Sequence, residues 1–519
     1  MAKRRRSFLD RALAAVGLSR TASVSTRQYA GAKHSALTQD WFTSMLSADQ
    51  EIKASLQKLR DRSRALVRDF AYASRFVQAV AENVVGPNGI GLQVRTETQG
   101  GALKATLNDE VEAKWARWCE PANCTVDGRL GFVDLEHLIA ETLPADGEVL
   151  VRIVRGFPDN PFRFALQLLD ADQLDTLYER GADQNGDGWI RMGVEMNRWG
   201  RPVAYWLWTQ HPSEYGRGGK RRERVSADDI IYLGLQRRPN QTRAVPWFAP
   251  VLISERMLAG WEEASVTSAR AGALTPFWLT APDPDKLGDT AIPADYTMEL
   301  SPEVQGQALP PGYTVQTFDP KYPNAEFDPF RNAILQSIAA GLRVSHLTLT
   351  GDTRQANYSS MRAGMLPERE AWKLLAKWLV RHFHARVYRE WVKAAVLSGA
   401  LEVPPREMER VLDGACWQFR GFPWIDPKAD IETAQAEVAM GINTLSNLAA
   451  ERGRDFEDTM REREREMEIA DEYGVTITLD ALPKATQPVD TTDATDSAPA
   501  DGAEPAPARA LRLARARHA

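Results

Sequence analysis

The residue types best able to bind a metal are the cysteines and histidines, and three of them fall near one another. Four residues separate Cys119 from Cys124, and His137 follows. Tetrahedral zinc needs a fourth ligand, and the remaining cysteine, Cys416, is distant in the sequence. We therefore interpret Cys119 and Cys124 as buried or half-buried thiols, and we expect neither a metal nor a cofactor.

One acidic stretch partly matches a calcium-binding loop. Asp183, Asn185, Asp187 and Gly188 correspond to positions 1, 3, 5 and 6 of an EF-hand. Val194 stands where that loop needs its closing glutamate, and no helical pattern flanks the stretch. A polar hairpin turn is the better interpretation.

The motifs of common hydrolytic enzymes are absent from the sequence. There is no Gly-x-x-x-x-Gly-Lys-Ser/Thr, no His-Glu-x-x-His and no Gly-x-Ser-x-Gly. The only Gly-Lys pair, at Gly219 and Lys220, is followed by arginine. We therefore predict no catalytic residue and a protein that is not an enzyme.

The composition is that of a globular protein. Of its 519 residues, 43% are hydrophobic and 26% are charged, and no apolar run reaches the roughly 18 residues of a membrane span. Three cysteines cannot staple so long a chain, which favours a reducing compartment. The net charge of -6 argues against a general nucleic-acid coat, but it is compatible with a channel along which nucleic acid slides.

Apolar residues at spacings of three and four predict a series of helices. We expect them at 37–81, 103–118, 250–273, 328–344, from a polar loop to 397 with a kink at Pro367, 431–450 with a break near Gly441, and 456–473. Asp49, Asp328 and Asp455 are the expected N-caps. A group of arginines within the first helix is interpreted as a solvated face, the alternative being contact with another subunit or nucleic acid: Arg60, Arg62, Arg64 and Arg68.

Alternating and β-branched segments predict short strands at 148–154, 164–169, 189–196, 202–208 and 230–233. Residues 197–200 supply the turn of a hairpin. The region therefore reads as α+β with a mostly antiparallel sheet. Residues 275–329 are rich in proline, and the pattern at 313–318 predicts a strand. Such a length is atypical of a bare loop, so we expect a small β-rich subdomain between two helices.

Small residues recur every fourth position along the helix expected at 250–273. They are Gly260, Ala264, Ser268 and Gly272. Residues spaced by four lie on one helical face, so this stripe allows a neighbouring helix to approach closely. Chance in an alanine-rich sequence is the alternative explanation.

A polar loop follows the helix that begins near 328. It reads Leu-Thr-Gly-Asp-Thr-Arg-Gln-Ala-Asn-Tyr-Ser-Ser-Met-Arg-Ala-Gly over residues 349–364 and resembles the lambda family of tailed-phage portal proteins. Four further stretches agree in order, at 59–69 with 83–86, 146–150, 168–175 and 193–205. The resemblance covers residues 28–473, with one departure at 67–70, where Val-Arg-Asp-Phe replaces the expected Arg-Asn stretch.

The resemblance implies a ring, usually of twelve copies, at one vertex of the capsid. Double-stranded DNA would pass through it, and its partners would be the terminase large subunit, head-completion or adaptor proteins, and the major capsid or scaffold protein, with no membrane contact. The protein would be assembled in the host cytoplasm and located in the virion. The alternatives are a DNA-packaging enzyme such as a terminase subunit, and a minor capsid or scaffold protein.

The family architecture has an α/β wing, long stem helices, a small β-rich clip and a helical crown. The expected parts are a flexible basic N-terminal arm at 1–27, the wing at 28–245, stem helices at 246–274 and 329–348 with the clip at 275–328 between them, a tunnel loop at 349–360, a long kinked wing helix and connection at 361–425, crown helices at 426–479, and a disordered tail at 480–519.

The tunnel loop would face the DNA channel. Its polar residues are Asp352, Thr353, Arg354, Gln355 and Asn357. Arg354 is the one most able to reach a phosphate, with Asp352 limiting its hold. The alternative is that Arg354 pairs with Asp352 or a neighbouring subunit and never contacts DNA.

Overall fold

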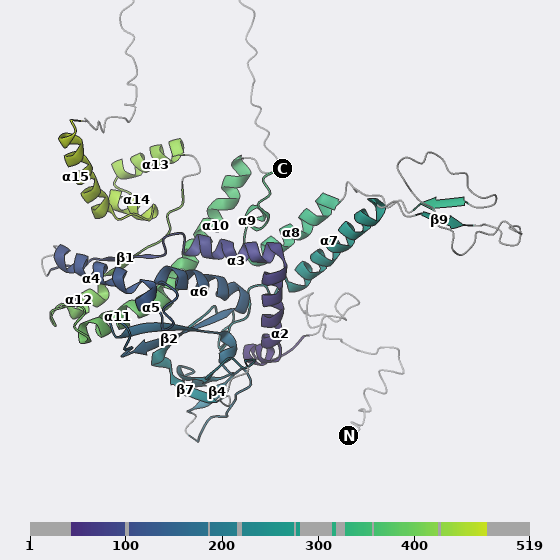
Figure 1. The fold of residues 1–519 in the computed structure, drawn as a ribbon, viewed down its shortest axis with the longest axis horizontal. Coiled ribbons are helices and arrows are strands. Elements are labelled where there is room, and N and C mark those ends of the chain that lie inside the picture. Colours follow the sequence, from purple (N-terminus) through teal and green to yellow (C-terminus); the bar gives the residue numbers. More distant parts are fainter. Residues whose placement is uncertain are drawn as a thin grey trace, which may run out of the picture. The chain divides into compact units, whose positions relative to one another are not determined.

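The computed structural model describes residues 43–98, 103–184, 187–214, 221–273, 277–280, 314–317, 327–354, 358–423 and 427–474. The chain divides into two units, one up to Asp455 and one from Phe456. The described helices of the first unit are α2 (Ala48–Asp69), α3 (Ala71–Val84), α4 (Ala105–Trp118), α5 (Pro121–Cys124), α6 (Phe132–Asp146), α7 (Leu252–Ala273), α8 (Phe327–Leu342), α9 (His346–Thr350), α10 (Tyr358–Leu379), α11 (Ala385–Leu397), α12 (Met408–Asp413), α13 (Pro427–Ala439) and α14 (Leu445–Glu451). The second unit contributes α15 (Phe456–Glu472) (Figure 1).

The described strands form four antiparallel sheets. They are β1 (Gly91–Val94), β2 (Glu148–Arg155), β3 (Phe164–Leu169), β4 (Trp189–Arg191), β5 (Val194–Met196), β6 (Pro202–Trp208), β7 (Arg222–Ser226), β8 (Ile230–Gly234), β9 (Phe277–Thr280), β10 (Thr314–Thr317) and β11 (Ala415–Gln418). The sheet orders are β3-β2-β8, β4-β5-β6-β7, β1-β11 and β9-β10. The predicted α+β class with mostly antiparallel pairing is confirmed.

The helix expected at 37–81 is two helices in the described part, which begins at residue 43. Ser47 rather than Asp49 caps α2, because its side chain and that of Gln50 form a capping box. Phe70 takes an extended conformation (φ -121°, ψ 127°) and separates α2 from α3. The break was not predictable from glycine or proline, since neither occurs there; it lets Leu66 and Phe76 reach the same core.

The segment expected as one strand at 189–196 is two strands. Met192 (φ 46°) and Gly193 (φ 82°) both have left-handed backbone conformations, as a two-residue hairpin turn requires. This turn joins β4 to β5, and the predicted turn at 197–200 joins β5 to β6. The polar turn expected at Asp183 is also seen, since Asp183 and Asp187 exchange hydrogen bonds of 2.9 and 2.7 Å.

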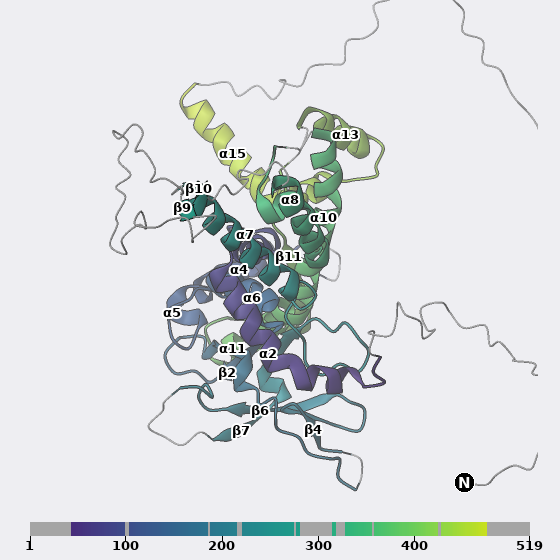
Figure 2. The same ribbon diagram turned by 90° about the vertical axis from the view of Figure 1, so that its right-hand side faces the viewer.

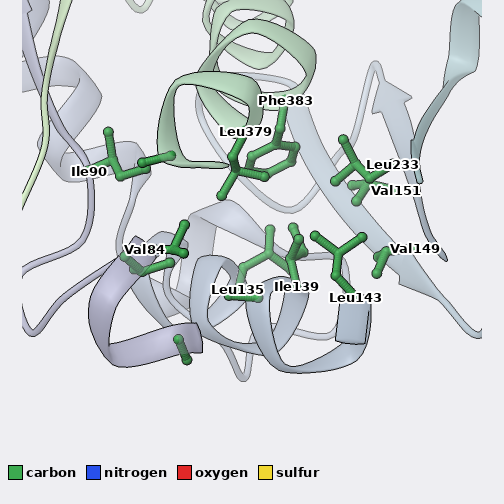
Figure 3. Close-up of a cluster of buried hydrophobic side chains, with 14 of the residues drawn as sticks. Val84, Ile90, Leu135, Ile139, Leu143, Val149, Val151, Leu233, Leu379 and Phe383 are labelled. Carbon is green, nitrogen blue, oxygen red and sulfur yellow. The ribbon is translucent and has the colours of Figure 1, made fainter. Parts of the chain in front are cut away.

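Helix α6, which the sequence patterns did not reveal, lies at the centre of the main core. Figure 3 shows its side chains Leu135, Ile139 and Leu143 between β2 and the helical segment that carries Phe383. The helix ends at Gly147, whose φ is 86°. A Cβ there would lie 2.2 Å from the backbone carbon of Val245, so only glycine fits this position.

The long helix expected to reach residue 397 is interrupted. A π-helical segment, Val380–His384, separates α10 from α11, and it turns His384 inward. The imidazole of His384 and the carboxylate of Glu136 on α6 are both fully buried and hydrogen-bonded to each other. The interruption thus serves a polar contact inside the core.

The remaining expectations on the later helices are largely confirmed. Helix α7 runs to Ala273 as predicted, while α8 begins at Phe327, so Asp328 lies in its first turn rather than at the cap. The break near Gly441 separates α13 from α14, and the strand expected at 313–318 is β10, paired with β9. Most of the segment 275–328, the N-terminal 42 residues and the tail from 475 lie outside the described residues. Within the described part, no helix has the length and hydropathy of a membrane span.

Candidate functional site

Helices α7 and α8 form an antiparallel pair, so the start of α7 lies beside the end of α8 (Figures 1 and 2). At one end a Cβ on Gly341 would lie 2.4 Å from Val251 Cγ1. Further along, the Trp261 ring stacks on Phe327 with 4.6 Å between centroids, and Phe330 meets it edge-on at 5.0 Å. Aromatic packing and close backbone approach therefore hold the pair together.

The predicted stripe lies on the side of α7 away from this contact at its first two positions. Gly260 and Ala264 are exposed, whereas Ser268 and Gly272 are half-buried. A Cβ on Gly260 would meet nothing within 4 Å. Two large apolar side chains on the same face are also exposed: Ile253 by 74% and Met257 by 69%. The described part of the chain leaves this apolar helical face uncovered.

The predicted polar loop is shorter than expected. Helix α9 continues to Thr350, and α10 begins at Tyr358. Gly351 ends α9 in the left-handed conformation (φ 71°), and the Arg75 Nε–H of α3 donates to the Thr348 carbonyl at 2.9 Å. The described loop is therefore residues 351–354, anchored on α3.

Within this loop the structure brings Arg354 and Asp352 together. Arg354 Nη2 lies 2.8 Å from Asp352 Oδ2, and Nη1 lies 3.5 Å from Asp328 Oδ2 on α8. Hydrogen bonds from Arg354 hold the pKa of the Asp352 carboxyl well below its usual range. Arg354 nonetheless remains 62% exposed and Thr353 is exposed, while Gln355 and Asn357 lie outside the described residues. Arg354 is thus paired within the chain and still open to solvent.

The arginines of α2 separate into two kinds. Arg62 and Arg68 are exposed, as a solvated face requires, but Arg60 is fully buried and Arg64 is only partly exposed. For Arg60 and Arg64 the solvated-face interpretation is wrong. Their side chains enter an ion network that we call the wing network, and its members are Arg60, Arg64, Asp146, Glu148, Asp170, Asp172, Tyr232 and Arg243.

Glu148, at the start of β2, is the centre of the wing network. It is fully buried and accepts from Arg60 Nη2 at 2.7 Å, from Arg243 Nε at 2.8 Å and from the Tyr232 hydroxyl at 2.7 Å. Burial by itself would raise the pKa of Glu148, yet Arg243 and Arg60 hold that pKa below its usual range. Glu148 is therefore an ionised carboxylate whose buried charge is balanced by two arginines.

Arg64 extends the wing network towards the surface. It binds both Asp146 oxygens at 2.7 Å, and it reaches Asp172 at 2.7 Å and Asp170 at 2.8 Å. The network joins α2, the end of α6, β2 and the turn after β3. Three of the five sequence stretches that resemble portal proteins (59–69, 146–150 and 168–175) therefore meet at this one place, although nothing in their spacing predicted the contact.

One group among the described residues has the spacing of a metal site. The ligand atoms of Asp170, Asp172 and His211 lie within 4.8 Å of one another. Arg60 and Arg64 already bind Asp172, and Arg64 also binds Asp170, so these carboxylates have cationic partners.

The cysteines are in the state that the sequence predicted. Cys124 is buried, Cys119 is half-buried, and both are free thiols. His137 Nε2 lies 2.8 Å from the Gly86 carbonyl.

These features define a mixed α+β protein with a paired-helix extension and an arginine-bearing loop, and its sequence matches a known family model. Residues 34–375 match the model described as phage portal protein, lambda family. The chain belongs to this family, and its role is that of a portal protein, the head–tail connector of a phage. That membership does not favour the terminase alternative.

Several phage proteins are similar over most of their lengths. The probable portal protein of Halomonas phage phiHAP-1 is 31% identical over 446 residues, covering 83% of this chain and 85% of that protein. The portal protein of Escherichia phage N15 is 21% identical, with 82% and 87% covered. Portal protein B of Escherichia phage lambda is also 21% identical, with 85% and 90% covered.

Solved structures with a detectable likeness include chains of gene transfer agent particles. The neck of an empty particle computed with C6 symmetry aligns with a TM-score of 0.42 and 14% identity, over 77% of this chain and 93% of that chain. The neck of a native particle computed with C12 symmetry aligns with a TM-score of 0.39 and 13% identity, over 76% and 93%.

Proposed function

We propose that this portal protein assembles into a ring of twelve copies at one capsid vertex, through which double-stranded DNA enters and leaves the head. The ring docks the terminase large subunit during packaging and head-completion proteins afterwards. It is a structural conduit and not an enzyme, it resides in the virion, and it assembles in the host cytoplasm. In this proposal residues 28–245 with 361–425 are the wing, α7 and α8 the stem, 275–328 the clip, 349–360 the tunnel loop and 426–479 the crown.

The uncovered face of α7 is the observation that carries the ring. Gly260 and Ala264 form a smooth exposed strip beside exposed Ile253 and Met257. Exposed apolar surface of this kind marks a protein contact, and small residues allow helices to pack at short distance. When each copy contacts the next through two different faces, the copies form a closed ring if the rotation between neighbours divides a full turn.

Purified full-length protein tests the proposal directly. Native mass spectrometry and negative-stain images are expected to show a closed ring with a central hole, and the ring is expected to lack ATPase and nuclease activity. A chain that stays monomeric at micromolar concentration, or one that hydrolyses ATP at a rate that survives repurification, contradicts it.

Enlarging the α7 stripe is expected to block ring formation without unfolding the chain. Ala264→Leu adds its side chain to an exposed position, so the isolated fold has room for it, whereas a helix packed closely in the ring does not. Circular dichroism and thermal unfolding should match the parent chain, and native mass should shift to monomer. Ala269→Leu makes the same change at an exposed position of α7 on the far side of the helix from Gly260 and Ala264, and it is the matched control; equal assembly of both variants contradicts the stripe's role.

Arg354→Ala is expected to leave ring assembly intact and to reduce DNA packaging or retention. The guanidinium is exposed beside Asp352, so it can exchange a carboxylate for a passing phosphate without a large desolvation cost. Packaged DNA per particle is the measurement. Arg62→Ala, an exposed arginine on α2, is the control for lost surface charge, and normal packaging by Arg354→Ala rings would exclude a DNA role for this residue.

A further inference from the structure

A groove on the first unit carries positive charge that nothing in the described chain neutralises. Its volume is about 320 Å³, and it lies between α3, the end of α8, α10 and the loop after β8. The residues that matter are the apolar side chains of Phe76, Trp372, Leu374 and Trp378 and the guanidinium groups of Arg237, Arg343 and Arg381. Since an engineered cavity of about 150 Å³ holds benzene, this groove has room for about two aromatic rings.

The arginines of the groove lack acidic partners among the described residues. No ion pair with a carboxylate forms at Arg237, Arg343 or Arg381 there, although most arginines around them are paired. Partial desolvation and the neighbouring Arg343 lower the pKa of Arg237. The Trp247 indole Nε1–H, which also belongs to the groove lining, is enclosed and has no acceptor in the described part of the chain. The three arginines are exposed and are available to an anionic group.

The apolar wall of the groove also lacks a cover. Leu374 on α10 is 69% exposed. Trp378, one helical turn further along, is only half-buried. An occupant that contacts both the arginines and the apolar wall of the groove must place a carboxylate next to large apolar side chains.

A segment of this chain that has this chemistry starts close by. Asp40, Trp41 and Phe42 directly precede the described part of the chain, whereas the tail after residue 474 has no phenylalanine, tryptophan or tyrosine. The start of α2 is held on the loop that carries Arg237, because Glu51 pairs with Arg238 at 2.6 Å and Asp49 accepts from the Thr242 N–H at 2.7 Å. The six peptide steps from Trp41 to Ser47 span roughly 20 Å when extended.

We propose that Asp40, Trp41 and Phe42 dock in this groove of their own subunit, with the Asp40 carboxylate between Arg237 and Arg343 and the two rings against α10. The docked segment anchors the N-terminal arm to the body of the protein. The basic residues 3–6 then extend from a fixed point on the α10 side.

Photo-cross-linking of the full-length chain tests the docking. With p-benzoylphenylalanine in place of Leu374, irradiation is expected to join α10 to the tryptic peptide His34–Lys53. The same group in place of Leu397, which is 89% exposed and roughly 30 Å further along the helix, should give no such product. Cross-links from position 374 that omit this peptide overturn the proposal.

Charge reversal and isotope labelling complete the test. Asp40→Arg is expected to reduce the yield about tenfold, as loss of a charge-assisted contact does, and Arg343→Asp in the same chain should restore it. Aspartate tolerates the left-handed backbone at position 343 (φ 63°), so the second change need not strain the fold. An unchanged yield in Asp40→Arg overturns the charge contact. In rings of mixed heavy and light chains, products that join the two isotopes overturn docking within one subunit.

Discussion

Glu148→Gln is expected to lower the free energy of unfolding by about 3–5 kcal/mol, the usual cost of removing one partner of a buried ion pair. Glutamine fills the same space but carries no charge, and its amide group places a donor among the donors of Arg60 and Arg243. Arg60 retains Asp172, whereas Arg243 keeps only backbone carbonyls, such as that of Met192 at 2.8 Å. The melting temperature should fall by roughly 3–5 °C.

An exposed ion pair provides the matched control for this change. Asp413→Asn removes the partner of Arg389, and these side chains are 65% and 48% exposed. Such pairs contribute about 1 kcal/mol or less, so the melting temperature should hardly move. If Glu148→Gln melts with the parent chain, the wing network does not stabilise the fold.

The wing network also predicts a pH dependence. The pKa values of Glu148 and Asp172 are both lowered in the folded state: desolvation raises them, but the combined coulombic and hydrogen-bond effects of the arginines exceed it. A lowered pKa contributes stability above the unfolded value, near 4–4.5, and that stability is lost as the pH falls through the folded value. Burial raises the pKa of Asp146, which acts in the opposite direction. Glu148→Gln should therefore show a weaker loss of stability in acid than the parent chain.

Replacing residues 284–310 by a short Gly-Ser turn is expected to abolish DNA packaging while leaving rings intact. The strands β9 and β10 pair with Thr280 opposite Thr314, and paired strands lie about 5 Å apart, so a short linker can close the hairpin. In the proposed architecture this replacement removes half of the clip, where the motor docks. Loss of terminase binding in a pull-down, together with normal rings by negative stain, is the expected result.

A variant matched in length distinguishes loss of the clip from loss of any long insertion. A variant in which residues 284–310 are replaced by a Gly-Ser stretch of equal length should fail in packaging just as the short variant does. Packaging by the short variant at the parent level would contradict the assignment of the clip as the motor's docking site.

The order of the helices and strands was largely predictable from the sequence, because its signals are local. The spacing of apolar residues and the absence of proline in 252–273 predicted α7, and alternation predicted β2, β3, β6 and β8. Glycine marked the break between α13 and α14. The family resemblance rested on five short stretches of sequence, and the family model confirmed it.

The states of single side chains depended on partners far away in the sequence. Arg60 and Arg62 are two residues apart on one helix, yet one is fully buried and the other is exposed. The difference arises because Glu148, 88 residues further on, faces Arg60, and no local pattern records that contact. Phe70 likewise ends α2 without any residue that breaks helices.

The sequence by itself determined the class of fold, the family, and the paired helices with their small-residue stripe, because helical periodicity and capping act within a few residues. Only the tertiary structure decided which arginines are buried, where α6 lies, how Arg354 is paired, and that three arginines and an apolar wall share one groove. Burial and ion pairing depend on which distant segments come into contact. The free energy of each buried charge is set by its desolvation and by the partners that those segments supply.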